Sequence, residues 1–325
     1  MMVRVLCVTV IGVCAAISAV ASARAAEVRV YPPPPPAVSP IAGAIDFHVH
    51  SAPDVFGRGY EDVDVARLAA RQGMRALVLK NHVTSTADRA QMVTKAVPEI
   101  EAFGGIVLNQ AVGGINAAAV EWMYRMEGGR GRVVWLPSFD ADYHLRTFGE
   151  PGEGLKVAVD GVVTPEMEKV LRVIAREDLV LCTSHVSPEE ALAVIRRGRE
   201  LGASRFVITH AMADVPGFSI AQMKEAASMG AYMELVFLND MMGPNAYLPW
   251  MRHWKRVSIA DMAAAIKQVG AAHFILSSDL GQTGNPAHPD GYKLLVDGLG
   301  QAGVSRADID LMMKRNPAWL LGLDG

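Results

Sequence analysis

The sequence predicts a (β/α)₈ TIM barrel that forms a single catalytic domain, and the first indication is a regular alternation of elements. Past Ile41, short apolar runs rich in β-branched residues alternate with longer segments of helical periodicity. The eight runs are 44–50, 76–82, 105–110, 132–138, 179–185, 205–210, 232–237 and 273–279. Eight such units close most naturally into a barrel, whereas a doubly wound open sheet is the alternative. No dinucleotide-binding glycine fingerprint follows the first run, which disfavours the open sheet.

The helical segments between these runs carry end signals. SPEEALAVIRRGRELG (187–202) and SIADMAAAIKQVG (258–270) begin with serines that suit an N-cap and end with glycines that suit a C-cap. YEDVDVARLAARQG (60–73) has the same amphipathic spacing. Pro188 fits the first turn of a helix over 187–202. All three segments are therefore expected to be helices.

The first run, AIDFHVH, ends in titratable residues. Alternation with period two is expected to send Asp46, His48 and His50 to one face of the strand and the apolar residues between them to the other. The two histidines then stand roughly 6.6 Å apart at the backbone, a spacing at which both imidazoles can converge on one ion. For an isolated H-x-H, a surface strand that happens to carry two histidines is the alternative.

Further titratable residues fall at the ends of other runs, and this is the strongest signal in the sequence. Five of the nine histidines and one aspartate occupy such positions: His48, His50, His82, His185, His210 and Asp279. A barrel brings these strand ends to one rim. Neutral imidazoles with a carboxylate suit zinc, manganese, iron or cobalt better than calcium or magnesium, and Zn²⁺ is the expected ion.

Lys80 has the same parity as His82 and is expected to point into the barrel. One reason for a buried lysine beside a metal is carboxylation of its amine by carbon dioxide, which makes an anionic bridge between two ions. The alternative is a salt bridge to a barrel carboxylate such as Glu234.

The chain from about Ile41 to its end resembles the metal-dependent amidohydrolase superfamily. The resemblance rests on the D-x-H-x-H of residues 46–50, the strand-end residues His185, His210 and Asp279, and the closing NPAWLLGL (316–323). It implies that His48 and His50 bind one metal and that His185 and His210 bind a second metal or the substrate. It also implies that Asp279 is both a metal ligand and the general base. If Asp279 is not the base, His82 or His210 is the expected proton carrier.

The fourth run departs from the family pattern. The family often supplies a carboxylated lysine or a glutamate there, but VVWLPSFD offers only Asp140 beyond the strand end. Lys80 or His82 could substitute from the second run, where LKNH also resembles the polymerase-and-histidinol-phosphatase type of phosphoesterase. The bridging ligand, and with it a site of one or two ions, stays open.

The resemblance and the site residues together predict a metal-dependent hydrolase that cleaves an amide, lactone or related ester. A metal-dependent, non-oxidative decarboxylase of an aromatic or enolic acid is the second hypothesis, a phosphoesterase the third, and a binding protein with a degenerate site the last. A formal net charge of −3 offers no basic field for nucleic acid, so a small-molecule substrate is expected. A homo-oligomer is possible.

The N-terminus has the three parts of a secretory signal peptide: Arg4, an apolar stretch to about Val20, and small residues before a cut after Ala25. An uncleaved membrane anchor is the alternative. Cleavage would leave 29 basic and 34 acidic residues, a net charge of 29 − 34 = −5. Residues 1–25 are therefore predicted to be a signal peptide, 26–40 a proline-rich arm and 41–325 the barrel of an exported protein, periplasmic or secreted. Cys182 is then the only cysteine left.

Several other residues have weaker signals. His144 and His288 are expected in loops from which they could reach substrate, and His253 and His273 are expected to be structural. Asn109 and Glu234 could orient the ligands or satisfy barrel hydrogen bonds. The segment 237–254, rich in methionine and aromatic residues, is expected to be a substrate lid or an oligomer contact.

Overall fold

The computed structural model describes residues 38–323, so the predicted signal peptide and most of the predicted proline-rich arm lie outside the described residues. Eight parallel strands form the main sheet: β1 (Ile45–Val49), β2 (Ala76–Leu79), β3 (Glu101–Val107), β4 (Gly131–Trp135), β7 (Val180–Cys182), β8 (Phe206–Ile208), β9 (Ala231–Val236) and β10 (Phe274–Ser277). Each strand overlaps one of the eight predicted runs. All eight observed strands end earlier than predicted, so the strand-end histidines other than His48 stand just beyond the sheet.

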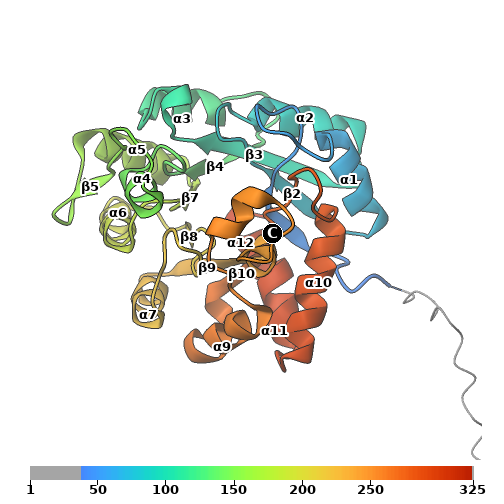
Figure 1. Cartoon of the computed structure of the whole chain (residues 1–325). Helices are drawn as coiled ribbons and strands as arrows, with labels where there is room; N and C mark the ends of the chain where they lie inside the picture. The colour runs from blue at the N-terminus through green and yellow to red at the C-terminus, as the bar shows by residue number, and fades with distance from the viewer. Residues whose placement is uncertain (1–37, 324–325) are drawn as a thin grey trace, which may run out of the picture. The chain divides into compact units, whose positions relative to one another are not determined.

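The strands neighbour one another in chain order and curve into a barrel, as Figure 1 shows. A bridge between Val49 and Leu280 joins the first strand to the segment after the last, and the His50 amide donates to the Leu280 carbonyl at 3.0 Å. A doubly wound sheet would place its first strand in the interior of the order. The alternative fold is therefore excluded, and the (β/α)₈ barrel is confirmed.

Helices follow the strands and pack around the barrel. They are α1 (Asp62–Arg71), α2 (Ala87–Ala96), α3 (Ala117–Tyr124), α4 (Asp142–Phe148), α5 (Pro165–Arg176), α6 (Pro188–Glu200), α7 (Ile220–Ser228), α8 (Leu238–Met241), α9 (Ile259–Val269), α10 (His288–Gln301), α11 (Arg306–Asp310) and α12 (Asn316–Leu321). Ser187 and Ser258 are the N-caps of α6 and α9, each with a complete capping box. Within 38–323, no helix combines the length and hydropathy needed to cross a membrane.

Two groups of buried apolar side chains hold the barrel together. The larger lies between the strands and the surrounding helices. The smaller lies inside the barrel, takes side chains such as Phe47, Phe103 and Trp135 from the strands, and includes Leu320 and Leu321 of α12. Because α12 packs against residues near the starts of the strands, it covers the N-terminal end of the barrel and leaves the C-terminal end for the site.

A β-bulge in β1 corrects the predicted alternation. Asp46 pairs with Leu77, but the next pair joins Val49 to Leu79, so β1 holds one residue more than β2 over this interval. Phe47 consequently packs inside the barrel, where strict alternation with His48 would have excluded it. Asp46 does not join the histidines and instead accepts the Ser278 backbone N–H at 2.9 Å. Burial raises the pKa of Asp46 to about 7.

Three segments elaborate the barrel between its strands and helices. A small antiparallel hairpin, β5 (Ala158–Val159) and β6 (Val162–Val163), lies between β4 and α5 and was not predicted. The helix α4 precedes that hairpin. The insertion after β9 contains α8 and the short 3₁₀ helix η2 (Pro249–His253). The helix α4, the insertion after β9 and the loop after β1 contribute residues to the surroundings of the site.

Candidate metal centre and active site

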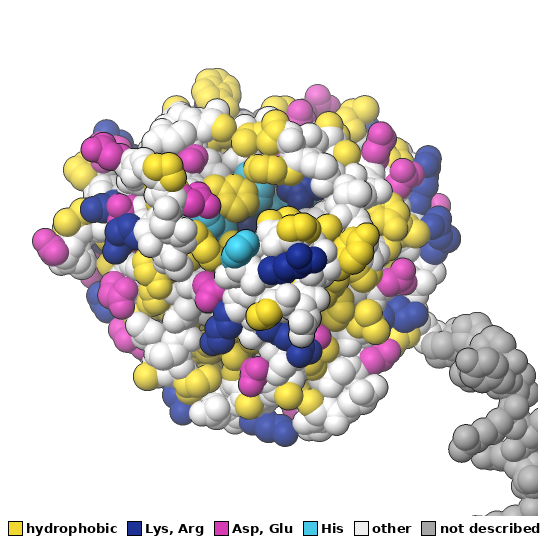
Figure 2. Space-filling model, viewed as in Figure 1, with side chains coloured by type: hydrophobic (Ala, Val, Ile, Leu, Met, Phe, Trp, Pro, Cys, Tyr) yellow, Lys and Arg dark blue, Asp and Glu magenta, His cyan; other side chains and the backbone are white. Residues whose placement is uncertain are grey.

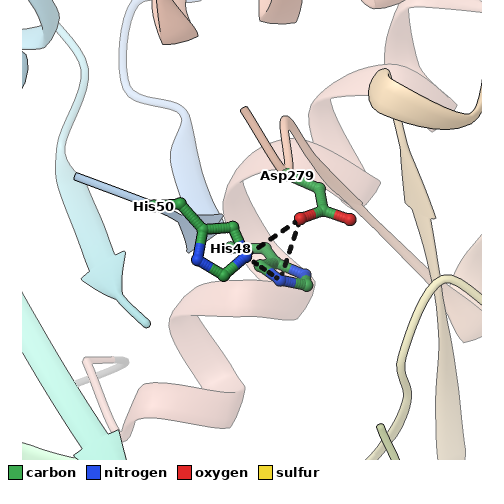
Figure 3. Close-up of side chains that lie close together, drawn as sticks. All are labelled: His48, His50 and Asp279. Carbon is green, nitrogen blue, oxygen red and sulfur yellow. Dashed lines mark hydrogen bonds and ion pairs between the residues drawn. The ribbon is translucent and has the colours of Figure 1, made fainter. Parts of the chain in front are cut away.

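The centre of the site is a group of three side chains at the C-terminal end of the barrel, drawn in Figure 3. His48 Nε2 lies 3.2 Å from His50 Nε2 and 3.1 Å from Asp279 Oδ1, and His50 Nε2 lies 3.2 Å from the same oxygen. Ligands held about 2.1 Å from an ion stand about 3.0 Å apart at right angles and about 3.4 Å apart in a tetrahedron. The observed triangle falls between these values, so the group has the dimensions of a metal site.

Hydrogen bonds at the far nitrogens set the tautomers of both histidines. His48 Nδ1 is 3.2 Å from Glu234 Oε2, and His50 Nδ1 is 3.2 Å from the Lys80 carbonyl oxygen. Because a carboxylate and a carbonyl only accept, each Nδ1 carries the hydrogen and donates it. The two Nε2 lone pairs and Asp279 Oδ1 then face one another, an arrangement that could hold a metal ion.

Burial also keeps the imidazoles of the site in the neutral form that binds metals. Desolvation lowers the pKa of His50 and His82 well below the usual value, and the nearby charge of Arg58 acts in the same direction. Desolvation and the neighbouring Lys80 lower the pKa of His210 to about 3. These side chains are therefore neutral ligands or hydrogen-bonding groups at ordinary pH.

The backbone conformation after β10 fixes the position of Asp279. Asp279 adopts a left-handed conformation with φ 54°, and its amide donates to the His48 carbonyl at 2.9 Å. A Cβ on Gly281 would lie 1.8 Å from the His50 carbonyl oxygen, and φ there is +127°, so glycine is needed for this close approach. His210 is also left-handed, with φ 31°. Strained residues next to the ligands are typical of sites whose geometry is over-determined by their surroundings.

Lys80 reaches the same centre from β2, as its parity predicted. Its Nζ lies 3.1 Å from His48 Nε2 and 5.6 Å from the centroid of the Trp135 ring. The alternative prediction, a salt bridge to Glu234, is not seen among the described residues, where Glu234 contacts His48. Desolvation lowers the pKa of the buried Lys80 amine, although Asp279 and Glu234 act against this shift.

Glu234 fixes the orientation of His48 from β9. Besides His48 Nδ1, its Oε2 accepts the His210 backbone N–H at 3.2 Å, so one carboxylate positions residues from two strands. Burial alone would raise the pKa of Glu234, but its charge interaction and hydrogen bond with His48 bring that pKa down to about 2. The carboxylate is therefore ionised, and its hydrogen bond to Nδ1 makes His48 Nε2 a stronger electron-pair donor to a metal ion.

Glu234→Gln is expected to weaken metal binding about 10- to 100-fold, because the amide still accepts a hydrogen bond but no longer carries the charge that favours the correct tautomer. Competition with a fluorescent chelator measures the affinity. Glu150→Gln is the matched control, since Glu150 lies at the rim with a side chain 51% exposed. Equal affinities for the two variants would contradict the positioning role of Glu234.

The other strand-end histidines lie around the triangle without joining it. His82 stacks on His50 with ring centroids 4.9 Å apart, and its Nδ1 is 2.9 Å from Ser138 Oγ. Asn109 links these two residues, because its amide nitrogen donates to the His82 carbonyl and to Ser138 Oγ. His82 thus stands over the triangle from β2, on the side away from His210.

His185 and His210 lie together on the opposite wall, with ring centroids 5.0 Å apart. His210 stacks near His48 at 6.1 Å, whereas His185 is 2.9 Å from His144, Nδ1 to Nδ1. One of these two nitrogens must be protonated and the other must accept. Asp140, which follows the fourth strand, accepts the Gln110 backbone N–H at 2.7 Å and is not part of the metal group.

A cavity of about 840 Å³ opens above these residues and is walled largely by aromatic and aliphatic side chains. The walls include Phe56, Phe139, Phe148, Leu238, Met242, Leu248, Trp250 and Trp254. Figure 2 shows histidine side chains in a hollow whose surroundings are mostly hydrophobic. The cavity admits a small, largely apolar molecule and holds its polar groups against the histidines at the floor.

Three predictions about the remaining histidines change. His144 lies in α4 rather than in a loop, is buried and lines the cavity. His288 begins α10 and donates from Nε2 to the His50 carbonyl at 2.8 Å, so it supports the strand instead of facing substrate. His253, expected to be structural, lines the cavity within the insertion after β9. His273 lies in a short 3₁₀ helix, η3 (Ala271–His273), before β10.

Arg58 is the residue that sequence reasoning missed. It follows β1 in an irregular loop and lines the cavity, with its Nη2 3.3 Å from His50 Nδ1. No strand-end position marks it in the sequence. A cation eight residues after a pair of ligating histidines was the only available signal, and a single such residue has little specificity.

Residues 43–234 match a protein family described as a family of unknown function, DUF6282. The match spans more than half of the chain. The chain belongs to DUF6282. The matched segment contains His48, His50, Lys80 and Glu234 and ends before Asp279. No curated protein matches the chain in sequence.

Solved structures resemble this DUF6282 chain in fold. An organophosphorus hydrolase from Deinococcus radiodurans aligns with a TM-score of 0.57 and 17% identity over 87% of this chain and 94% of its own. A structure titled as organophosphate hydrolysis engineered from a weak promiscuous lactonase template gives 0.57 and 17%, over 88% and 97%. A mutant of a PTE-like lactonase from D. radiodurans gives 0.56 and 17% over the same shares. At this identity the likeness establishes the barrel fold.

Proposed function

We propose that this chain is a metal-dependent hydrolase that cleaves ester or lactone bonds in a small molecule. The main observation that supports this proposal is the group of three potential ligand atoms, from His48, His50 and Asp279, on the floor of an apolar cavity. Its position at the C-terminal end of a (β/α)₈ barrel is where such barrels place their chemistry. The resemblance of its motifs to the amidohydrolase superfamily and the titles of the structural neighbours support the same reaction class.

A divalent ion bound by the triangle would supply a Lewis acid that polarises the scissile carbonyl and acidifies water. Asp279 Oδ1 faces the two histidines, while Oδ2 has no hydrogen-bond partner in the described chain and is placed to take a proton from water. Asp279 then returns that proton to the leaving alcohol. The aromatic walls exclude bulk water and orient the apolar part of the substrate.

The donor set of two imidazoles and one carboxylate favours Zn²⁺, with Mn²⁺, Fe²⁺ or Co²⁺ as alternatives. A second ion would take His185 and His210 as ligands and would need an anionic bridge. Lys80, 3.1 Å from His48 Nε2, is the residue placed to supply one by carboxylation, in which the amine adds carbon dioxide and releases a proton. His82 and His210 are the other candidate proton carriers.

A non-oxidative decarboxylase is the second candidate. It is favoured by the observation that, within residues 38–323, only one group of three potential ligands converges, which suits single-ion chemistry on a carboxylate. Amide hydrolysis is a further candidate from the superfamily resemblance, and organophosphate hydrolysis from its similarity in fold to organophosphorus hydrolases. All of these reactions use the same floor of the cavity.

Metal-reconstituted protein should be assayed on lactones, carboxylic esters, amides, phosphotriesters and aromatic carboxylic acids, with chelator-treated protein as the control. We expect hydrolysis of lactones or esters that disappears with the metal and returns on its addition. Release of carbon dioxide from an acid without ester or lactone hydrolysis would replace this proposal with the decarboxylase. Equal rates with and without metal would exclude both.

We further propose that the chain is exported and cleaved near Ala25, on the N-terminal pattern alone. The insertion after β9 is proposed as a lid, because Leu248, Trp250 and Trp254 form part of the cavity wall. Contact with a second copy of the chain is the other role for this insertion, since Tyr247 and Trp250 remain exposed. The mass of the protein in solution distinguishes a monomer from a homo-oligomer.

A further inference from the structure

The cavity wall contains a cation whose purpose the metal group does not explain. Among the described residues that line the cavity, the lysine and arginine side chains are Lys80, which belongs to the floor, and Arg58. The Arg58 side chain is only 5% exposed. A buried guanidinium is costly unless its charge and its donors are satisfied, so its partners indicate its role.

Asp54 satisfies one edge of this guanidinium. Asp54 Oδ2 accepts from Arg58 Nε at 2.8 Å and lies 2.7 Å from Nη2, while Oδ1 accepts the backbone N–H groups of Val55 and Phe56. Arg58 is therefore held in one orientation by a carboxylate that is itself fixed. A guanidinium that is already held in place loses little conformational entropy when it binds a second planar anion.

The other edge of Arg58 is uncommitted. Nη1 has no hydrogen-bond partner within residues 38–323, and Nη2 has His50 Nδ1 at 3.3 Å as its only neighbour besides Asp54. His50 Nδ1 donates to the Lys80 carbonyl in the tautomer that binds metal, so it cannot also accept from Arg58. The loaded site thus leaves donors on Arg58 for a ligand in the cavity.

The surroundings of Arg58 define what else that ligand carries. The guanidinium lies 5.7 Å from the Phe56 ring centroid, and Phe56 packs edge-on against Phe139 at 5.8 Å. These two rings form an apolar surface beside Arg58. The loop is fixed against the segment after β10, because Gly59 N–H donates to the Gly281 carbonyl at 2.9 Å.

We propose that Arg58 binds a carboxylate of the substrate, so that the natural substrate is an ester or lactone with an apolar body and a free carboxylate near the scissile bond. Arg58 is separated from the metal group by the width of the His50 ring, which sets the carboxylate a few bonds from the reacting carbonyl. The ester or lactone bond in this inference rests on the proposed function. The carboxylate rests on Arg58 alone.

Binding to metal-free protein separates these two parts. The probes are 3-phenylpropanoate and its neutral analogue 3-phenylpropanamide, titrated calorimetrically into chelator-treated protein. We expect the carboxylate to bind about 10- to 100-fold more tightly than the amide, the range of one charge-assisted bidentate contact. Arg58→Gln should abolish this preference and Arg58→Lys should retain part of it, while the exposed Arg172→Gln should change nothing.

Loss of Arg58 leaves Asp54 buried without its partner, so the variant Asp54→Asn/Arg58→Gln removes both charges and circular dichroism verifies folding. The kinetic test uses metal-restored protein and aryl esters with and without a free carboxylate. We expect Arg58→Gln to raise KM for the ester that carries the carboxylate and to leave KM for the neutral ester unchanged. A carboxylate preference that persists in folded Arg58→Gln protein, or no preference in the wild type, overturns the inference. A preference without any ester hydrolysis leaves the inference standing and overturns the proposed reaction.

Discussion

Replacing both His48 and His50 with alanine is expected to take the protein from about one bound ion per chain to almost none, because two of the three converging ligand atoms disappear. Asp279 alone is too weak a ligand to retain a divalent ion through dialysis. Elemental analysis of the dialysed protein measures the loss, and circular dichroism measures the fold.

The double variant also leaves buried groups without partners. Glu234 loses its contact with His48 Nδ1, and Lys80 loses a hydrogen-bond acceptor, so a lower melting temperature is expected within a barrel that still folds. His144→Ala/His253→Ala is the matched control, since it removes two cavity histidines outside the metal group. Full metal retention by His48→Ala/His50→Ala, or equal metal loss in the control, would contradict the assignment of the centre.

The strands and the floor of the site could be predicted because they follow from local pattern. Each barrel strand is a short apolar run, and the barrel geometry places the residues that end these runs on one rim. The approach of His48, His50 and Asp279 follows from those two facts. No knowledge of side-chain packing was needed to bring residues 48 and 279 together.

The bulge in β1 shows where local pattern fails. Strict alternation accounted for His48 and His50 but assigned Phe47 and Asp46 to the wrong sides, because one additional residue against β2 changes the parity within the strand. A bulge depends on the register with the neighbouring strand, which a single run of letters does not contain. The convergence of His48 and His50 was therefore predicted from an incomplete geometry.

The walls of the cavity were the least predictable part. Arg58, His144 and His253 reach it from a loop, a short helix and an insertion, and their positions depend on how these segments fold back over the barrel. Loop conformation is set by contacts distant in sequence, such as the bridge between Arg58 and Gln282. Specificity therefore resides in the residues that sequence patterns describe worst.

Asp279→Asn is expected to lower turnover about 10²- to 10⁴-fold at saturating metal, because the amide oxygen still coordinates weakly but cannot accept a proton. The histidines carry most of the metal affinity, so much of the ion should remain bound. Burial raises the pKa of Asp279 above its usual value, although His48 and Lys80 act against the shift. The measurement is turnover and metal content of the same preparation.

The comparison of these two quantities separates a base from a ligand. A residue that only holds the ion would lose metal and activity together and recover activity when excess metal is supplied, whereas a base would remain inactive with the ion bound. Asp140→Asn is the control, because that carboxylate also follows a barrel strand but hydrogen-bonds to the Gln110 backbone. Turnover near the wild-type value in Asp279→Asn would remove this residue from proton transfer. The proton would then move through His82 or His210, whose rings lie 4.9 Å from His50 and 6.1 Å from His48 on opposite sides of the triangle.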